Sequence, residues 1–143
     1  MQEDRQEYFY NIGVSYKKAD ANTRGKFSLT KENQIALLKL SKEKGFKGIF
    51  IISTCNRTEI TGFAERPCQL IELLCTFTEG TIEEFAKFSN VYKDQEAIHQ
   101  LFRIGTGLES QILGDYEIVG QLRQAFRLAK SLKTVNAYSE RLM

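Results

Sequence analysis

Gly48-Ile-Phe-Ile-Ile-Ser-Thr-Cys-Asn-Arg-Thr-Glu-Ile-Thr-Gly-Phe63 carries the clearest structural signal in the chain. Between its first glycine and Ser53 the residues are β-branched or aromatic, which predicts a strand covered on both faces. A strand-like pattern resumes over residues 58–63, so Thr54-Cys-Asn-Arg57 is a tight connection between two strands. Cys55 is therefore expected at a rim of the sheet, where a side chain can meet a ligand.

An earlier strand is predicted over residues 8–16, where two kinds of side chain alternate. One side would carry Phe9, Asn11, Gly13 and Ser15. The other side would carry tyrosine, isoleucine and valine, and this alternation is typical of a half-buried strand. Residues 20–23 are interpreted as a loop that follows it.

The remaining segments indicate helices and one more short strand. A capped helix begins near Ser28 or Thr30 and ends at Gly45. Helical spacing continues over residues 67–88 with a break at 78–80, and residues 90–93 read as a short strand. The apolar residues of 97–104 and 118–132 then follow helical spacing, with glycines between the two segments. These elements predict an α+β fold in one domain, residues 1–143: a small mixed or antiparallel sheet flanked by helices, with a helical C-terminal third.

Composition excludes several classes of protein. The chain has 143 residues, 42% hydrophobic and 27% charged, which is an ordinary globular mixture rather than a fibrous or disordered one. A net charge of +2 is too close to neutral for a protein whose whole surface grips nucleic acid. The longest apolar run is far shorter than a membrane span, and the N-terminus lacks the pattern of a secretory signal. We expect a cytoplasmic protein that makes no membrane contact.

Three cysteines and one histidine limit the chemistry. Cys55, Cys68 and Cys75 are an odd number without metal-binding or dithiol spacing, so we expect a reducing compartment and no metal site. Cys55, two residues before Arg57, is either an activated nucleophile or a small buried residue beside an unrelated arginine. Cys68 and Cys75 are seven positions apart on an amphipathic helix and are expected to pack in the core.

Three other features leave alternatives open. His99 lies at the border of an apolar helix face, where a histidine can either donate a proton to a substrate or simply pack against the core. The segment from Gly105 to Gly114 fits neither a dinucleotide-binding nor a P-loop pattern. Helical spacing also places four cationic side chains on one face of the last predicted helix. This face either binds RNA phosphates or is an ordinary solvated surface. These cations are Arg123, Arg127, Lys130 and Lys133.

Two segments together resemble the signature stretches of glutamyl-tRNA reductase, the first enzyme of the C5 route to tetrapyrroles. The first is Ser53-Thr-Cys-Asn-Arg-Thr-Glu-Ile60. The second is His99-Gln-Leu-Phe-Arg-Ile-Gly-Thr-Gly-Leu-Glu-Ser-Gln-Ile-Leu-Gly-Asp-Tyr-Glu-Ile-Val-Gly-Gln121. The resemblance covers essentially the whole chain and corresponds to the family's N-terminal catalytic domain.

The resemblance implies an oxidoreductase that uses a cysteine nucleophile. The family uses NADPH to reduce the glutamyl ester of tRNA(Glu) to glutamate-1-semialdehyde, through a thioester on the motif cysteine, here Cys55. A thiol suits this task, because its thiolate displaces the tRNA hydroxyl and the resulting thioester accepts hydride. His99 matches a histidine important for activity, which would polarise the ester carbonyl or hydrogen-bond the substrate.

The resemblance also implies a set of substrate-binding residues. Thr54, Asn56 and Arg57 match positions that hold the glutamyl group, and Arg57 would pair with its carboxylate or favour the Cys55 thiolate. Glu59 would bind the substrate ammonium group or form an ion pair with Arg57. The other matched positions are Ser110, Asp115, Tyr116, Glu117 and Gln121. The family more often has glutamate and glutamine at positions 115 and 117, so the chain carries a shorter carboxylate and an added charge there.

The family's NADPH-binding and dimerisation domains have no counterpart in this sequence. Residues 133–143 end without a helix stop signal, which favours a cut inside a longer protein. We expect the chain to accept a glutamyl group on Cys55 and release it slowly to water, but to make no aldehyde even with NADPH. The resemblance implies glutamyl-tRNA(Glu) and the downstream glutamate-1-semialdehyde aminomutase as partners. It implies a dimer for the full-length family and leaves the oligomeric state of this chain open.

Two other functions compete with this hypothesis. A non-catalytic module could bind the acceptor end of tRNA through Arg123, Arg127 and their neighbours, and its binding would survive Cys55→Ser. A thiol redox protein could use Cys55 alone, and the lack of a resolving cysteine counts against it.

Overall fold

The computed structural model describes residues 6–105 and 116–134. Its centre is a four-stranded sheet in the order β2-β3-β1-β4, in which every neighbouring pair is antiparallel. The strands are β1 (Tyr8–Ser15), β2 (Lys47–Ser53), β3 (Arg57–Ala64) and β4 (Ser89–Lys93). The predicted α+β class is confirmed, and the sheet is antiparallel.

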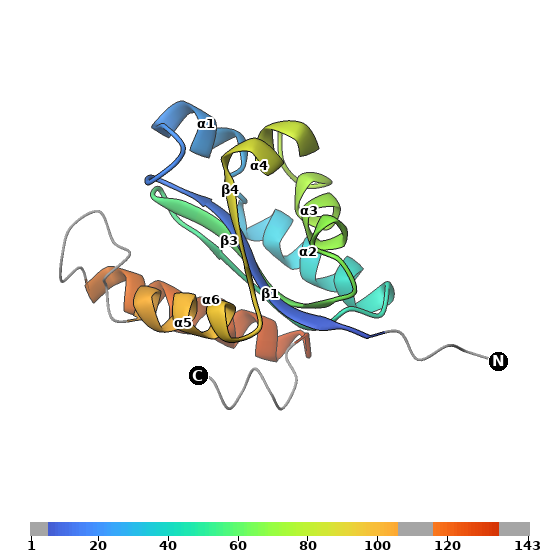
Figure 1. Cartoon of the computed structure of the whole chain (residues 1–143). Coiled ribbons are helices and arrows are strands. Elements are labelled where there is room, and N and C mark those ends of the chain that lie inside the picture. Colours follow the sequence, from blue (N-terminus) through green and yellow to red (C-terminus); the bar gives the residue numbers. More distant parts are fainter. Residues whose placement is uncertain (1–5, 106–115, 135–143) are drawn as a thin grey trace.

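Helices cover both faces of the sheet (Figure 1). One face packs against α2 (Lys31–Glu43), α3 (Pro67–Cys75) and α4 (Ile82–Phe88). The other face packs against α5 (Gln95–Gly105) and α6 (Tyr116–Ser131). A short helix, α1 (Ala21–Lys26), lies beside α4 at one end of the sheet. Among the described residues, no helix has both the length and the apolar character needed to cross a membrane.

The prediction that β1 is half-buried was wrong, because the strand is buried on both faces from Phe9 to Ser15. The side with Asn11 and Ser15 does not meet water but packs beneath α5 and α6, where Asn11 Nδ2 donates to Thr61 Oγ1 at 3.0 Å. Thr61 on β3 therefore takes the place of water for the amide nitrogen of Asn11.

The expected loop at residues 20–23 was also wrong, because α1 begins there. Asp20 caps this helix, since its carboxylate accepts from Thr23 N at 2.8 Å. The same backbone bond is the main cause that lowers the pKa of Asp20 below its usual value. The helix expected from Ser28 or Thr30 to Gly45 is confirmed as α2, with Thr30 as its cap and Gly45 at a positive φ of 84°.

The outer edge of β2 is partly covered by the chain beyond α6. Ile49 N donates to Thr134 O at 2.7 Å, and Thr134 Oγ1 donates to Ile49 O at 2.8 Å. These two bonds fix α6 alongside β2 and pair the backbone of an otherwise open edge. The expected covering of β2 on both faces is confirmed, because residues Gly48 to Ile52 are all buried.

Candidate functional site at the turn between β2 and β3

Cys55 lies at the tip of a tight turn that joins β2 to β3. Thr54 N donates to Arg57 O at 2.8 Å, which closes the turn. Thr54 Oγ1 accepts from Asn56 N at 3.1 Å and from Arg57 N at 3.2 Å, so one hydroxyl holds both amides after the cysteine. Cys55 itself is exposed. The predicted connection is confirmed, and it presents the thiol to solvent on a rigid backbone.

Two neighbouring segments hold the turn from outside. Arg24 Nε in α1 donates to Cys55 O at 3.1 Å, and its Nη1 donates to Ala19 O at 2.7 Å. Tyr16 N, just after β1, donates to Asn56 O at 2.9 Å. The sequence did not indicate Arg24, because no local pattern links it to a residue 31 positions away.

Arg57 and Glu59 form a buried ion pair at the start of β3. Arg57 Nη1 lies 3.2 Å from Glu59 Oε2, and the two side chains are only 1% and 5% exposed. Phe50 of β2 packs on Phe126 of α6, so Ile52, two residues later on the same strand, faces α6 as well. The register pairs Ile52 with Glu59, so the side chains of Glu59 and of Arg57, two residues before it, also lie on the α6 side of the sheet. Of the two expectations for Glu59, the structure supports the ion pair with Arg57.

Gly13 of β1 leaves the space that Glu59 occupies. A Cβ at position 13 would lie 2.4 Å from Glu59 Cγ and 2.5 Å from the carbonyl oxygen of Thr58. Because one of these atoms belongs to the backbone of β3, a side chain here would force the two strands apart. Gly13 therefore allows the ion pair to sit within the sheet below the cysteine turn.

We expect Gly13→Ala to lower the free energy of unfolding by about 2–3 kcal/mol, because overpacking at this site moves backbone as well as side chain. Gly25→Ala is the matched control, since a Cβ there meets nothing within 4 Å and alanine favours the α1 helix. Urea unfolding followed by circular dichroism measures both. Equal stability of the two variants would contradict this account of Gly13.

The other two cysteines differ from each other. Cys68 is exposed, so its predicted packing in the core was wrong: it falls in the first turn of α3, on the solvent side. Cys75 is half-buried and packs against the core, as predicted. Burial raises the pKa of the Cys75 thiol to about 11.

This raised pKa predicts slow labelling of Cys75. At pH 8 a thiol with a pKa of about 11 is thiolate in roughly one molecule per thousand, against roughly one in four for an ordinary thiol with a pKa near 8.5. Iodoacetamide should therefore label Cys75 roughly 200-fold more slowly than an ordinary thiol. The rate should rise about tenfold per pH unit up to pH 11 in the folded chain. Peptide mapping by mass spectrometry measures this, with Cys68 as the exposed reference. Equal labelling of Cys68 and Cys75 at pH 8 would contradict it.

His99 lies on the exposed surface of α5. It lines a small pocket of about 250 Å³ with Tyr92, Glu96 and Arg103. β4 ends at Lys93, which pairs with Tyr10 near the start of β1. The cysteine turn lies at the opposite end of β1, where Ser15 pairs with Arg57. Helix α5 begins at the end of the sheet remote from Cys55, and His99 comes little more than one turn later. The described contacts group His99 with this pocket rather than with the turn.

The predicted residues of the second signature are only partly visible. Ser110 and Asp115 lie outside the described residues. Tyr116, Glu117 and Gln121 fall in the first turns of α6, where only the backbone is described. Thr134 pairs with Ile49, and Gln124 lines a cavity together with Thr54, so α6 runs antiparallel to β2. The N-terminal turns of α6 are therefore directed toward the end of the sheet that carries Cys55.

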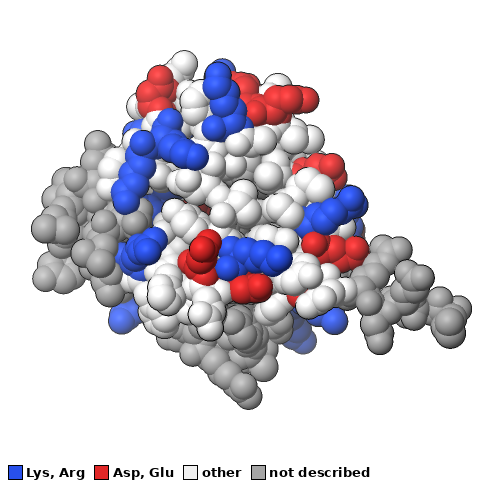
Figure 2. Space-filling view, viewed as in Figure 1, with Lys and Arg blue, Asp and Glu red and all other residues white. Residues whose placement is uncertain are grey.

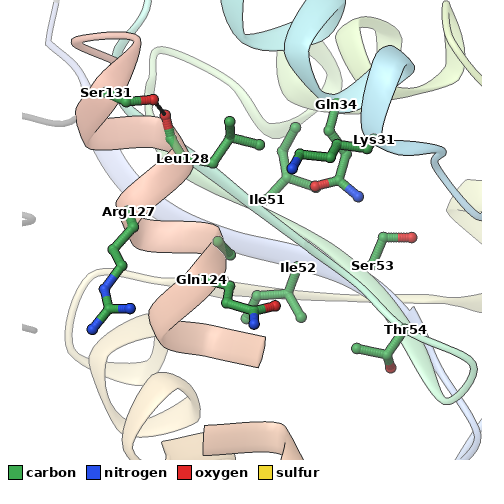
Figure 3. A pocket seen from close by; sticks show the side chains of 11 residues that line it. Lys31, Gln34, Ile51, Ile52, Ser53, Thr54, Gln124, Arg127, Leu128 and Ser131 are labelled. Atoms are coloured by element: carbon green, nitrogen blue, oxygen red, sulfur yellow. Dashed lines mark hydrogen bonds between the residues drawn. The ribbon is translucent and has the colours of Figure 1, made fainter. Parts of the chain in front are cut away.

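A cavity of about 640 Å³ adjoins the turn, between α2 and α6 along β2 (Figure 3). Thr54 stands at one end of it. Arg123, Arg127, Lys130 and Lys133 are all exposed, and of these four Arg127 lines the cavity. Figure 2 shows positive and negative side chains interspersed on the face it presents. No group of three or more His, Cys, Asp or Glu that could hold a metal ion occurs in the part of the chain that the structure describes.

Comparisons with known proteins give the family. A family model described as the N-terminal domain of glutamyl-tRNAGlu reductase matches residues 12–143. Glutamyl-tRNA reductase of Christiangramia forsetii is 58% identical over 139 residues, which are 97% of this chain and 33% of that protein. Glutamyl-tRNA reductase of Flavobacterium psychrophilum is 53% identical over 135 residues, with 94% and 33% covered.

A solved structure agrees in fold. Glutamyl-tRNA reductase from Methanopyrus kandleri superposes with a TM-score of 0.74 at 24% sequence identity, over 94% of this chain and 31% of that one. This chain spans about a third of the length of the curated relatives that it matches. From the family model and these identities, the chain belongs to the glutamyl-tRNA reductase N-terminal domain family.

Proposed function

We propose that Cys55 accepts the glutamyl group of glutamyl-tRNA(Glu) as a thioester. The thiolate attacks the ester carbonyl carbon, the bond from that carbon to the ribose oxygen breaks, and the tRNA leaves with a free terminal hydroxyl that takes up a proton. The observation that carries the proposal is the exposed thiol on a turn fixed by Thr54 Oγ1, Arg24 and Tyr16. A fixed nucleophile needs little reorganisation to meet an ester placed beside it.

We propose the reduction of this thioester to glutamate-1-semialdehyde, the first step of tetrapyrrole synthesis, as the activity of the longer enzyme. NADPH supplies the hydride in that reaction. The described residues do not fit NADPH, because all their strand pairs are antiparallel, whereas dinucleotides bind in the crevice of a parallel α/β sheet. We therefore derive no hydride step from these residues. A polypeptide of these 143 residues should form the adduct and yield no aldehyde when NADPH is added.

Intact mass spectrometry with glutamyl-charged tRNA tests the acyl transfer. One glutamyl adduct is expected on the wild-type chain, and peptide mapping should place it on Cys55. Cys68→Ser is the matched control because Cys68 is also exposed, and this variant should form the same adduct. An adduct that maps to Cys68, or no adduct together with no deacylation, would refute the proposal.

The family resemblance implies that His99 contacts the ester carbonyl of the substrate, whereas the described contacts group His99 with Tyr92, Glu96 and Arg103. We propose the role that the resemblance implies, and kinetics of a His99 variant decide between the two. Loss of a group that polarises this carbonyl should slow adduct formation by about 10²-fold, so we expect that effect for His99→Asn. Single-turnover kinetics with glutamyl-tRNA measure it. A rate within twofold of wild type would limit His99 to its surface pocket with Glu96 and Arg103.

A non-catalytic module that binds the acceptor end of tRNA is the second candidate. The four exposed cations of α6 and the residues just after it favour it. In that case tRNA would bind with no adduct and no deacylation, and Cys55→Ser would change neither result.

A further inference from the structure

Helix α1 is short but firmly attached to the segment around α4. None of its six residues is buried, and it lies beside α4 at one end of the sheet (Figure 1). Lys26 O, in its last turn, accepts from Glu79 N at 3.0 Å and from Gly80 N at 3.2 Å. Phe27, the next residue, is fully buried, and its ring meets the ring of Phe85 in α4 with 5.1 Å between the centroids. The C-terminal end of α1 is therefore fixed to the body of the domain.

Arg24 connects this helix to the cysteine turn. Its Nε donates to Cys55 O at 3.1 Å and its Nη1 donates to Ala19 O at 2.7 Å, so one guanidinium joins the loop after β1 to the turn after β2. The side chain is half-buried. Because the guanidinium is planar and always charged, its donors keep a fixed spacing and make charge-assisted hydrogen bonds. In the part of the chain that the structure describes, no other side chain bonds to Cys55.

The bond from Arg24 holds the peptide group that follows the nucleophile. The oxygen of this group is Cys55 O, which accepts from Arg24, and its nitrogen is Asn56 N, which donates to Thr54 Oγ1 at 3.1 Å. A peptide group is planar, so holding both of its ends constrains the backbone dihedral ψ of Cys55. This dihedral sets the direction of the Cys55 side chain relative to the turn. Without Arg24 the peptide group would be held only through its nitrogen, and the thiol would sample a wider range of directions.

We propose that Arg24 is a positioning residue for acyl transfer at Cys55. It acts through the backbone of the nucleophile rather than on the substrate, by tying the Cys55 carbonyl to α1 and so to α4. Attack on an ester requires the sulfur and the carbonyl carbon to be held about 3–3.5 Å apart in the correct orientation, and a misplacement of about 1 Å costs about 10²-fold in rate. This role rests on the proposed acyl transfer, because Arg24 has a part in that reaction only.

Single-turnover kinetics of adduct formation test the role of Arg24. Arg24→Gln should slow adduct formation at saturating glutamyl-tRNA by at least about tenfold, while the half-saturating concentration stays within about threefold of wild type. Arg24→Lys should be slow as well, because an ammonium keeps the charge but lacks the fork that spans two carbonyls. Iodoacetamide should label Cys55 in both variants within about twofold of the wild-type rate, since a small, freely diffusing reagent needs no fixed thiol direction.

Lys26→Gln is the matched control. Lys26 lies two residues later in α1, and its Nζ pairs with Glu84 Oε2 at 3.0 Å rather than with the turn. Adduct formation by this variant should stay within about twofold of wild type, because an exposed ion pair contributes little to the geometry at Cys55. Rates that fall in step with urea stability across all three variants would overturn the proposal. A wild-type rate in Arg24→Lys, or iodoacetamide labelling that slows in parallel with acyl transfer, would also overturn it.

Amide hydrogen exchange gives a second readout that does not involve tRNA. If Arg24 holds the peptide group after Cys55, Arg24→Gln should speed exchange of the Asn56 amide by at least about fivefold, and Lys26→Gln should leave it unchanged. NMR spectroscopy of the labelled chain measures both. Unchanged exchange at Asn56 in Arg24→Gln would overturn the role of Arg24 even if the wild type forms the adduct. No adduct on the wild type would instead refute the proposed acyl transfer, and the positioning role with it.

Discussion

Cys55→Ser should abolish the glutamyl adduct and slow deacylation of glutamyl-tRNA by a factor of at least about 10³. A serine hydroxyl is a weak nucleophile unless a base activates it, and the described contacts of the turn are hydrogen bonds to backbone carbonyls and amides. Deacylation is measured from the release of labelled glutamate. Treatment with neutral hydroxylamine should discharge the wild-type adduct, as expected for a thioester.

The same substitution should leave the fold intact. Cys55 is exposed, and the bonds that fix the turn use its backbone oxygen and the Thr54 hydroxyl rather than the thiol. We expect the free energy of unfolding to change by less than about 0.5 kcal/mol. Deacylation by Cys55→Ser at the wild-type rate would disprove the nucleophile. A large loss of stability would show that the turn needs the thiol itself.

The sequence predicted the turn and its cysteine because the signals there are local. An apolar run stops at four polar residues and a second strand pattern follows, so the connection and its place at the rim are visible in one short segment. The helix cap at Thr30 and the break between α3 and α4 are visible for the same reason. Each of these features depends on residues a few positions apart.

The features that escaped prediction depend on distant contacts. Asn11 and Ser15 read as a solvent face, but β3 supplies Thr61 and Arg57 opposite them. Arg24 reaches the cysteine turn from α1, 31 positions earlier. Cys68 shares a helix side with Cys75 by spacing, yet it lies in the first turn, at the solvent side of α3. Periodicity predicts which side of a helix or strand a residue lies on, but it does not predict which other segment of the chain packs against that side.

Arg57→Met should lower the free energy of unfolding by about 3–5 kcal/mol, because it removes the guanidinium that pairs with the buried Glu59 carboxylate. Glu59→Met should lower the free energy of unfolding by a similar amount, because it removes the carboxylate that pairs with the buried Arg57 guanidinium. The double variant, Arg57→Met with Glu59→Met, should recover to within about 2 kcal/mol of wild type, since apolar side chains of similar volume often replace a buried ion pair at little cost. Urea unfolding of the four proteins measures the coupling between the two sites. Additive losses in the double variant would contradict a direct ion pair.

The double variant also separates stability from geometry at Cys55. Arg57 supplies the amide and carbonyl that close the turn, and its side chain fixes the strand directly after the cysteine. If the ion pair sets the position of the turn, the double variant should recover its stability but form the glutamyl adduct at least about tenfold more slowly than wild type. A double variant that is both stable and fully active would show that the pair only fills space beneath α6. The two measurements together decide whether this buried pair is retained for the chemistry of the thiol above it or for the packing of the sheet.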